Sequence, residues 1–189
     1  MAFDPAVFDA VVLAGGTGRR LGGQDKAELV VAGARLLDVV IGACAGAART
    51  VVVGPERPTV RTVAWTREQP PGGGPCAALA AGLELVTAPL TALLAVDLPH
   101  LTAETVVRLV AAAPVVAVDD DGREQWLLSA WPTEVLRGLP IEGSLSRALG
   151  PLAYTTLLVG SAARDVDTAD DLQAAADRTS TTPPTTRTG

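Results

Sequence analysis

Aromatic residues are scarce in this chain, and their scarcity excludes a core built from rings. Phe, Trp and Tyr make up 3% of the 189 residues, whereas apolar residues as a whole make up 48%. The chain is rich in alanine, valine and leucine, so we expect a core of closely packed aliphatic side chains. A chain of this length is long enough to bury such a core as one domain.

Histidine and cysteine are also rare. His100 is the only histidine, which excludes a metal site built from several histidines, and no catalytic Ser or Cys motif lies near it. We interpret His100 as a loop residue. Cys44 and Cys76 are the only cysteines and do not form a C-x-x-C pair. Two isolated thiols are typical of a reducing compartment, so we predict a cytoplasmic protein.

The chain has neither an excess of positive charge nor an apolar run of membrane-spanning length. Its formal net charge of −6 argues against binding to nucleic acid or to an anionic membrane. Residues 1–5 show no pattern of a secretion signal, and we expect no membrane partner. Residues 179–189 contain only Thr, Ser, Pro, Arg and Gly. We therefore predict a single domain at 1–178 followed by a disordered tail.

Glycine, in contrast, is concentrated near the N-terminus. Residues 11–26 run from an apolar segment into a loop with five glycines and three cations, VVLAGGTGRRLGGQDK. Glycine lets backbone N–H groups approach an anion closely, and Arg and Lys add positive charge. We interpret this stretch as a phosphate-binding loop in which Arg19, Arg20 and Lys26 supply the charge.

Two common glycine loops do not fit the spacing. Gly23 is followed by Gln24 rather than by Lys-Ser or Lys-Thr, which excludes a Walker loop, and Leu21 stands where G-x-G-x-x-G needs its last glycine. A dinucleotide-binding fold would also need an acidic residue about 20 residues later, at the end of a second strand, and this chain has none there. A glycine-rich turn with incidental surface arginines is the alternative interpretation.

Strand patterns alternate with helix patterns along most of the chain. We expect strands at 9–14, 50–53, 62–65, 90–96, 114–118, 125–130 and 154–159, helices at 36–47, 76–86, 103–113 and 169–177, and a hairpin-like turn at 119–123. This alternation predicts an α/β fold of three layers around a mostly parallel sheet. Such sheets bind their ligands at the carboxyl ends of the strands.

An aspartate follows the strand expected at 90–96. Asp97 would face the same crevice as the glycine loop, where a carboxylate can hold Mg²⁺ against phosphate oxygens. A strand-end aspartate can instead cap a helix, but Thr102 already offers the cap for the next helix. Thr168 and Asp171 have the spacing of a capping box, which leaves Asp167 between them and the preceding strand without an assigned role.

Four segments resemble the sugar-nucleotide-type nucleotidyltransferases, and the first is most similar to the MobA-like branch with its molybdenum cofactor guanylyltransferases. The segments are LAGGTGRRLGGQDK at 13–26, GPCAAL at 74–79, VDLP at 96–99 and DVDTADDL at 165–172. They occur in the order of the family and span residues 9 to about 175. The resemblance implies a Rossmann-like nucleotidyltransferase domain of α/β/α layers that works with Mg²⁺.

The resemblance also implies which residues form the site. Catalysis would depend on Arg20, Lys26 and Asp97, and Mg²⁺ would be held by Asp97 and Asp167, with Asp165 as the alternative to Asp167. The residues implied to bind the nucleotide are Leu13, Ala14, Gly15, Gly16, Gly18, Arg20, Lys26, Glu68, Gln69 and Asp97. The implied reaction transfers GMP from GTP to the phosphate of molybdopterin or Mo-molybdopterin. We expect a monomer or weak homo-oligomer with transient contacts to molybdenum cofactor enzymes.

Two departures from the family pattern leave alternatives open. Gln69, beside Glu68, stands where relatives usually carry an aspartate, so either Glu68 replaces it or an electrostatic contact is missing. Gln125 matches a residue that faces the acceptor, but Trp126 replaces the family's proline. A cytidylyltransferase, a sugar- or polyol-phosphate nucleotidyltransferase and a non-catalytic nucleotide-binding partner are the alternative functions.

Overall fold

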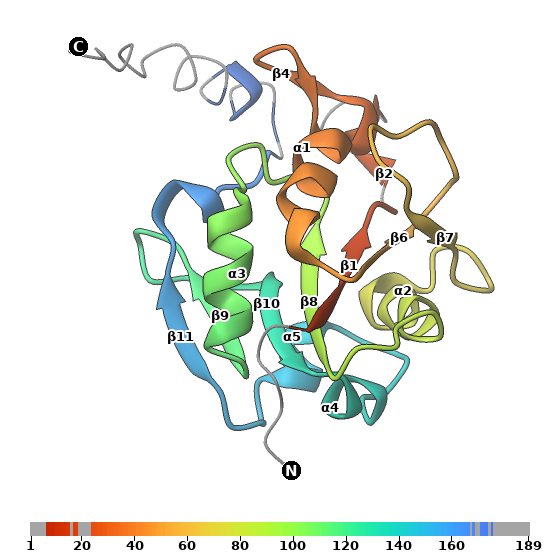
Figure 1. Ribbon diagram of the computed structural model, residues 1–189, viewed down its shortest axis with the longest axis vertical. Coiled ribbons are helices and arrows are strands. Elements are labelled where there is room, and N and C mark those ends of the chain that lie inside the picture. The colour runs from red at the N-terminus through yellow and green to blue at the C-terminus, as the bar shows by residue number, and fades with distance from the viewer. Residues whose placement is uncertain are drawn as a thin grey trace.

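A seven-stranded sheet forms the centre of the computed structural model, which describes residues 7–15, 17–18, 24–166, 168, 171–173 and 175 (Figure 1). The strands lie in the order β11 (Thr155–Leu158), β9 (Val115–Val118), β10 (Glu124–Pro132), β8 (Leu90–Ala95), β1 (Phe8–Leu13), β6 (Arg49–Val53) and β7 (Ala64–Thr66). Only β10 runs antiparallel to its neighbours, and the other pairs are parallel. The mostly parallel sheet is as predicted.

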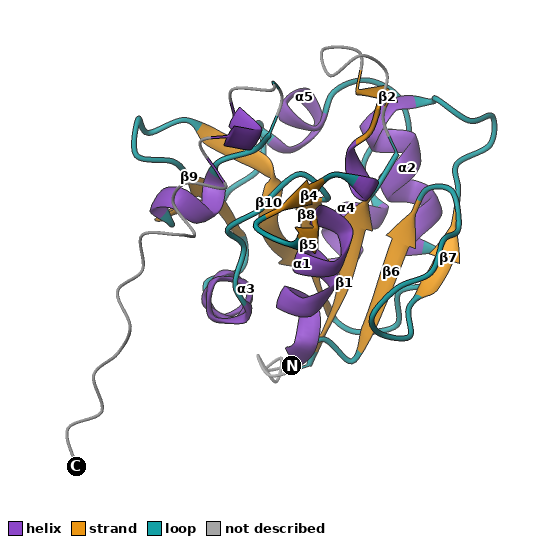
Figure 2. Ribbon diagram, turned by 90° about the horizontal axis from the view of Figure 1, so that it is seen from above, coloured by secondary structure: helices purple, strands orange, loops and turns teal. Residues whose placement is uncertain are grey.

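Helices cover both faces of the sheet, which completes the three layers. Figure 2 shows the two groups on opposite sides. One face carries α1 (Leu36–Ala43) and α3 (Ala103–Ala111), and the other carries α2 (Gly74–Leu83), α4 (Thr133–Arg137) and α5 (Leu145–Leu149). In the described part of the chain, short 3-10 segments join these elements: η2 (Lys26–Glu28), η3 (Cys44–Gly46) and η4 (Gly160–Ala163).

The central strand β1 shows why both faces are covered. Successive side chains of a strand point to opposite faces, and on β1 all of them are buried. Phe8, Ala10 and Val12 pack with α1 and α3, whereas Val11 and Leu13 pack with α2 and α5. The core is aliphatic apart from a few rings such as Trp131, which confirms the prediction from composition.

A buried carboxylate fixes the end of the sheet opposite the glycine loop. Asp9 is fully buried, and its Oδ2 accepts hydrogen bonds from the backbone N–H groups of Thr87, at 2.7 Å, and Ala88, at 3.0 Å. These bonds hold the turn between α2 and β8. Because the charge is paired with two backbone donors, we assign Asp9 to stability rather than to chemistry.

Two short ribbons, one within the glycine loop and one directly after it in the sequence, were not expected from the sequence. β2 (Thr17–Gly18) pairs with β3 (Gln24–Asp25), and β4 (Val30–Val31) pairs with β5 (Ala34–Arg35). Strands of two residues are too short to show an alternating pattern. The first ribbon joins the two described segments on either side of residues 19–23.

The helix boundaries differ from those expected. The helix expected at 36–47 ends at Ala43 and continues as η3, since Gly42 and Gly46 lower its helix propensity. The helix expected at 76–86 spans Gly74–Leu83 instead, because Pro75 already fits the first turn and the turn held by Asp9 follows. α3 ends at Ala111 rather than at 113. The five-residue helix α4 was not expected, because it is too short for a helical period.

The predicted helix caps are confirmed. Thr102 Oγ1 accepts a hydrogen bond from Thr105 N at 3.2 Å at the start of α3. Thr168 and Asp171 form the reciprocal bonds of a capping box, Thr168 N to Asp171 Oδ2 at 2.8 Å and Asp171 N to Thr168 Oγ1 at 3.2 Å. Residues 119–123 connect the antiparallel strands β9 and β10 as expected.

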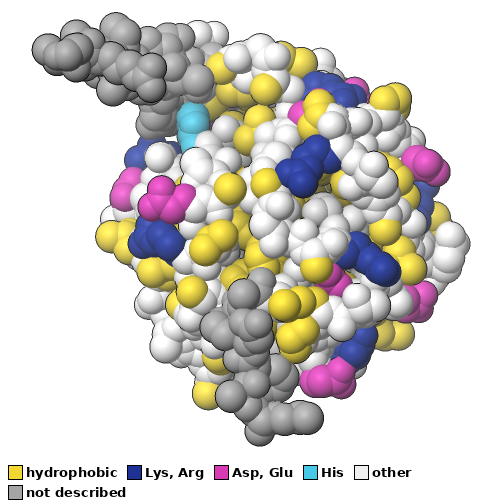
Figure 3. All heavy atoms as spheres, viewed as in Figure 1, with side chains coloured by type: hydrophobic (Ala, Val, Ile, Leu, Met, Phe, Trp, Pro, Cys, Tyr) yellow, Lys and Arg dark blue, Asp and Glu magenta, His cyan; other side chains and the backbone are white. Residues whose placement is uncertain are grey.

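Among the described residues, no helix combines the length and apolar character needed to cross a bilayer. On the face drawn in Figure 3, Lys and Arg side chains alternate with Asp and Glu, and hydrophobic side chains lie in small groups between them. The predicted tail at 179–189 lies outside the described residues.

Candidate nucleotide-binding site

A cavity of about 640 Å³ opens at the carboxyl ends of β1 and β6. Its floor includes Leu13, Ala14 and Gly15 from the end of β1 and Gly54 from the end of β6. Small-molecule sites commonly have volumes of roughly 300–1,000 Å³. The position is the one expected for a ligand in a parallel sheet, and three of the predicted nucleotide-binding residues share this floor.

Gly54 lets the two strand ends come close together. Ala14 N donates to Val53 O at 2.9 Å, and Gly54 N donates to Thr66 O at 2.9 Å. A Cβ at position 54 would lie 3.1 Å from the carbonyl carbon and oxygen of Ala14, and the φ of Gly54 is +157°. A larger residue would therefore push on the peptide that forms the floor of the cavity.

Lys26 and Asp97 meet beside this cavity, although 71 positions separate them in the sequence. Lys26 Nζ donates to Asp97 Oδ2 at 2.7 Å, and the two side chains are only 19% and 16% exposed. The pairing of β1 with β8 brings them together, and Val96 N donates to Leu13 O at 3.2 Å to extend that pairing. The structure thus joins the cation of the glycine loop to the predicted strand-end carboxylate.

The C-terminal motif also returns to Asp97. Val166 N donates to Asp97 O at 3.1 Å. This bond places Val166 next to the strand end, with Asp165, one of the two candidates for the second metal ligand, directly before it in the chain. Asp165 lines the second cavity described below, and Asp167 lies outside the described residues.

The residues at this strand end fit Mg²⁺ bound together with a phosphorylated substrate. Among the described residues, no three His, Cys, Asp or Glu side chains group closely enough to hold a metal by themselves. Mg²⁺ usually takes one or two protein carboxylates and completes its shell with phosphate oxygens and water. Asp97 supplies one such carboxylate, and it already faces a cation, the Lys26 ammonium group.

The loop before α2 closes the cavity from another side. Glu68 Oε1 accepts a hydrogen bond from Gly72 N at 2.8 Å, which ties residues 68–72 into a turn. Glu68 lines the cavity together with Arg67, whereas Gln69 is not among its lining residues. Of the two candidates to replace the family aspartate, Glu68 is therefore the one that the structure places at the cavity.

A second cavity, of about 550 Å³, lies beside the C-terminal motif and is lined mainly by charged and polar side chains. It includes His100, Asp119, Asp120, Asp121, Arg123, Gln125, Arg164, Asp165 and Asp171. The backbone N–H of Arg123, at 2.8 Å from Asp119 Oδ1, lowers the pKa of Asp119, and Gln125 Nε2 donates to its other oxygen at 3.2 Å. Asp119 therefore stays ionised and holds Gln125 in place.

Trp126 is half-buried against the core and does not line the nucleotide cavity or the second cavity. Its ring lies edge-on to that of Tyr154, with the centroids 5.5 Å apart, and packs with the apolar cluster on the α5 side of the sheet. The ladder between β9 and β10 is irregular between Gln125 and Ser129, where Trp126 lies. The replacement of the family's proline thus changes packing, while Gln125 keeps its place at the second cavity.

Sequence reasoning missed two cations of the nucleotide cavity, Arg57 and Arg67, of which Arg57 makes the more extensive contacts. Arg57 lines it, and its side chain is only 9% exposed. Arg57 Nη1 forms a short ion pair with Asp25 Oδ2, and Nε donates to Pro55 O at 3.0 Å. No periodicity or motif marks this contact, because it joins two loops 32 positions apart. The sequence offered one signal for Arg57: it is an arginine that lies shortly after a buried strand ending in glycine.

Several predicted residues lie where the structure gives no description. These are Gly16, Arg20 and Asp167, together with Arg19. Gly18 is part of β2, and its partner in the ribbon is Gln24. The roles predicted for these residues stay predictions.

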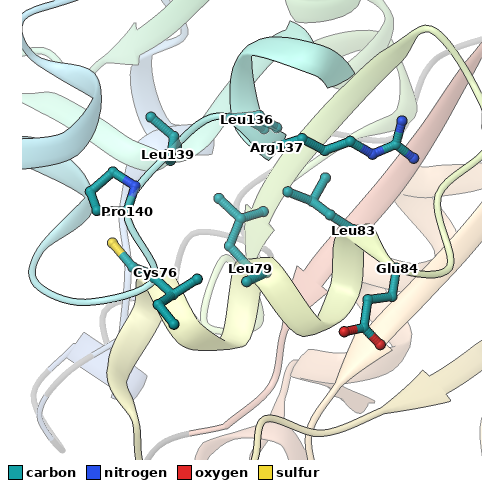
Figure 4. A pocket seen from close by; sticks show the side chains of 10 residues that line it. Cys76, Leu79, Leu83, Glu84, Leu136, Arg137, Leu139 and Pro140 are labelled. Carbon is teal, nitrogen blue, oxygen red and sulfur yellow. The ribbon is translucent and has the colours of Figure 1, made fainter.

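A smaller, apolar cavity of about 170 Å³ lies against other residues of α2 (Figure 4). The helix forms part of the wall of both cavities, with Gly74, Pro75 and Ala78 at the nucleotide cavity and Cys76 and Leu79 at the apolar one. Burial raises the pKa of Cys76, and it raises the pKa of Cys44 to about 12. Both thiols stay protonated near neutral pH, so neither is an activated nucleophile.

The fold and this arrangement of glycine loop, lysine and strand-end aspartate define an α/β domain of the nucleotidyltransferase class. The MobA-like NTP transferase family model matches residues 10–154. The chain belongs to the MobA-like NTP transferase domain family.

One curated protein is similar to this chain in sequence, and two solved structures are similar to it in fold. A molybdenum cofactor guanylyltransferase from Acidiphilium cryptum (strain JF-5) is 35% identical over 131 residues, which cover 65% of this chain and 66% of that protein, slightly less than two thirds of its length. A nucleotidyl transferase from Methanothermobacter thermautotrophicus superposes with a TM-score of 0.73 at 18% identity, covering 91% of this chain and 97% of that one. Molybdopterin-guanine dinucleotide biosynthesis protein A from Archaeoglobus fulgidus gives 0.65 at 19%, covering 92% and 100%.

Proposed function

We propose that this nucleotidyltransferase transfers GMP from GTP to the terminal phosphate of molybdopterin or Mo-molybdopterin and releases pyrophosphate. The name of the Acidiphilium relative supports the choice of guanylyl group and acceptor. The observation that carries the proposal is the contact between Lys26 and Asp97 beside the cavity formed by the ends of β1 and β6. The contact brings together a cation that can pair with phosphate oxygens and a carboxylate that can hold Mg²⁺.

The proposed reaction needs alignment and charge neutralisation more than it needs a base. An acceptor phosphate is already an anion, so one of its oxygens can attack the α-phosphorus of GTP without losing a proton. A new P–O bond forms to the α-phosphorus, the bond from the α-phosphorus to the bridging oxygen of the β-phosphate breaks, and pyrophosphate leaves. Catalysis of this type comes mainly from in-line positioning and from cations near the phosphates.

Each part of the proposed site has a role in this scheme. Backbone groups of residues 13–15 and of Gly54 would contact the guanine base and the ribose, and Lys26 would neutralise charge on the triphosphate. Asp97 would hold Mg²⁺, which supplies charge stabilisation on the phosphate oxygens when bound. Of the residues outside the described part of the chain, Arg20 is proposed for the triphosphate and Asp167 for the metal.

We assign the acceptor to the second cavity. Its aspartates can accept hydrogen bonds from the N–H groups of a heterocycle such as a pterin, and Gln125 offers an amide held by Asp119. Val166, at the same strand end as Asp97, lines this cavity, so an acceptor phosphate there would lie near the proposed metal ligand. The same geometry could serve another phosphorylated acceptor, which makes the choice of acceptor a matter for experiment.

Base selectivity tests the guanylyl assignment. A ligand that binds only the folded state raises the melting temperature by an amount set by its concentration relative to its dissociation constant. With Mg²⁺ present, we expect GTP to stabilise the protein more than CTP, ATP or UTP, with a selectivity of about tenfold, equivalent to about 1.4 kcal/mol. Stronger stabilisation by CTP would indicate a cytidylyltransferase, and no stabilisation by any triphosphate would indicate a non-catalytic protein.

We also propose that the protein acts in the cytoplasm as a monomer or weak homo-oligomer, with transient contacts to the enzymes that receive the cofactor. The two cysteines support the compartment, because both thiols are buried and unpaired.

A further inference from the structure

Arg57 is held by contacts on more than one side. Its Nε donates to the backbone of its own loop at Pro55 O, and its Nη1 pairs with Asp25 and lies 3.7 Å from Glu28 Oε1. An arginine fixed in this way loses little further freedom when a ligand binds. Among the described residues, none accepts a hydrogen bond from its Nη2, so the contacts of the guanidinium are made by Nε to its own loop and by Nη1 to the carboxylates of Asp25 and Glu28.

Asp25 transmits this contact to the turn that carries Lys26. Its Oδ2 pairs with Arg57, while its Oδ1 accepts a hydrogen bond from Ala27 N at 3.1 Å and so caps η2. Lys26 is the first residue of η2. The two oxygens of one carboxylate therefore join the loop after β6 to the lysine that contacts Asp97.

A second arginine strengthens the same connection. Arg35 Nε donates to Asp38 Oδ2 at 2.7 Å, Nη1 contacts Glu28 at 3.4 Å, and Nη2 donates to Pro58 O at 2.9 Å. Hydrogen bonding to Asp38 raises the pKa of Arg35, so the charge is constant across the working pH range. η2 is thus held at its first residues by Arg57 and at Glu28 by Arg35.

We propose that Arg57 is a positioning residue that acts through Asp25 to hold the Lys26 turn in the place where it meets the phosphates. The base-side wall of the nucleotide cavity and the phosphate-side lysine would then move as one unit. The expected effect on turnover rests on the proposed function. The expected effect on the position of the turn does not.

The first experiment needs no ligand. In Arg57→Ala, Asp25 loses its ion pair and caps η2 less firmly, so the backbone amides of residues 26–29 should exchange with deuterium at least about fivefold faster than in the unmodified protein. Arg57→Lys, which keeps a point charge near Asp25, should recover part of the protection. Arg61→Ala is the matched control, because Arg61 is an exposed cation of the same loop that does not line the cavity.

The second experiment asks whether Arg57 acts through Lys26. With GTP, Mg²⁺ and molybdopterin, Arg57→Ala should lower kcat about fivefold with little change in the KM for GTP, and the same substitution should have almost no further effect in a Lys26→Ala background. Arg61→Ala should leave both constants unchanged.

Unchanged exchange at residues 26–29 in Arg57→Ala would overturn the proposal. An equally large effect on kcat with and without Lys26 would also overturn it, since Arg57 would then act on the substrate independently. If the unmodified protein releases no pyrophosphate with any triphosphate, the proposed function fails, and the exchange experiment alone decides the role of Arg57.

Discussion

Replacing Gly54 with alanine should damage both the stability of the fold and the nucleotide cavity. The added Cβ would lie 3.1 Å from the carbonyl carbon and oxygen of Ala14 and 3.3 Å from Gly15 N. All of these are backbone atoms, so they cannot move aside as a flexible side chain would. The φ of +157° is in addition one that residues with a Cβ rarely adopt.

The magnitude follows from these two costs. An unfavourable backbone conformation costs about 1–3 kcal/mol, and forcing an extra carbon into a packed position costs about 1–3 kcal/mol. We therefore expect Gly54→Ala to lower the free energy of unfolding by roughly 2–6 kcal/mol. For a domain of this size each kcal/mol lowers the melting temperature by about 2–4 °C, so a fall of roughly 10 °C is expected.

Urea denaturation gives the free energy, and titration with GTP and Mg²⁺ gives the affinity. Gly42→Ala is the matched control, because Gly42 lies within α1 with no atom within 4 Å of a new Cβ, so it should raise stability by about 0.5–1 kcal/mol. A Gly54→Ala protein as stable as the control, with unchanged GTP affinity, would refute our account of how the two strand ends form the cavity floor.

Three further predictions concern single side chains. Asp97→Asn should fold normally but reduce kcat at least about tenfold, because the amide lacks the charge to hold Mg²⁺. Steady-state kinetics at a series of magnesium concentrations will show whether the concentration of Mg²⁺ needed for activity changes. Asp9→Ala leaves the backbone N–H of Thr87 and the buried N–H of Ala88 without their acceptor and should cost about 1–3 kcal/mol of unfolding free energy without altering GTP affinity at permissive temperature; a smaller loss would mean that water replaces the carboxylate. The thiol of Cys44 has a folded pKa raised from 9.0 to about 12, so above pH 9 the unfolded chain releases this proton first and stability falls as pH rises. Cys44→Ala should remove a slope of up to about 1.4 kcal/mol per pH unit between pH 9 and 12, and identical alkaline denaturation curves would contradict the assignment.

The local features of the fold could be predicted from the sequence because each depends on residues close together in the chain. The strand before the glycine loop, the cap at Thr102 and the capping box of Thr168 and Asp171 are of this kind. The place of Asp97 at a strand end could be predicted as well, since a continuous apolar run precedes it.

The contacts that assemble the site could not be predicted in the same way. Lys26 reaches Asp97 only because β1 and β8 are neighbours in the sheet, and Arg57 reaches Asp25 only because two loops fold over the same strand ends. Pairing between distant strands depends on the packing of the whole core and leaves no local pattern. The short helix α4 was missed for the opposite reason, because five residues contain too little of a helical period.

The measurement that tests the central claim most directly is identification of the products of the transfer reaction. Purified protein, Mg²⁺ and molybdopterin or Mo-molybdopterin are incubated with GTP, and in parallel with CTP, ATP and UTP, while pyrophosphate is quantified and the nucleotide product is identified by mass. Our account predicts pyrophosphate and a guanine dinucleotide of the cofactor in equal amounts with GTP, and roughly tenfold less product with the other triphosphates. Pyrophosphate release that does not depend on the acceptor, preference for another base, or no release at all would contradict it.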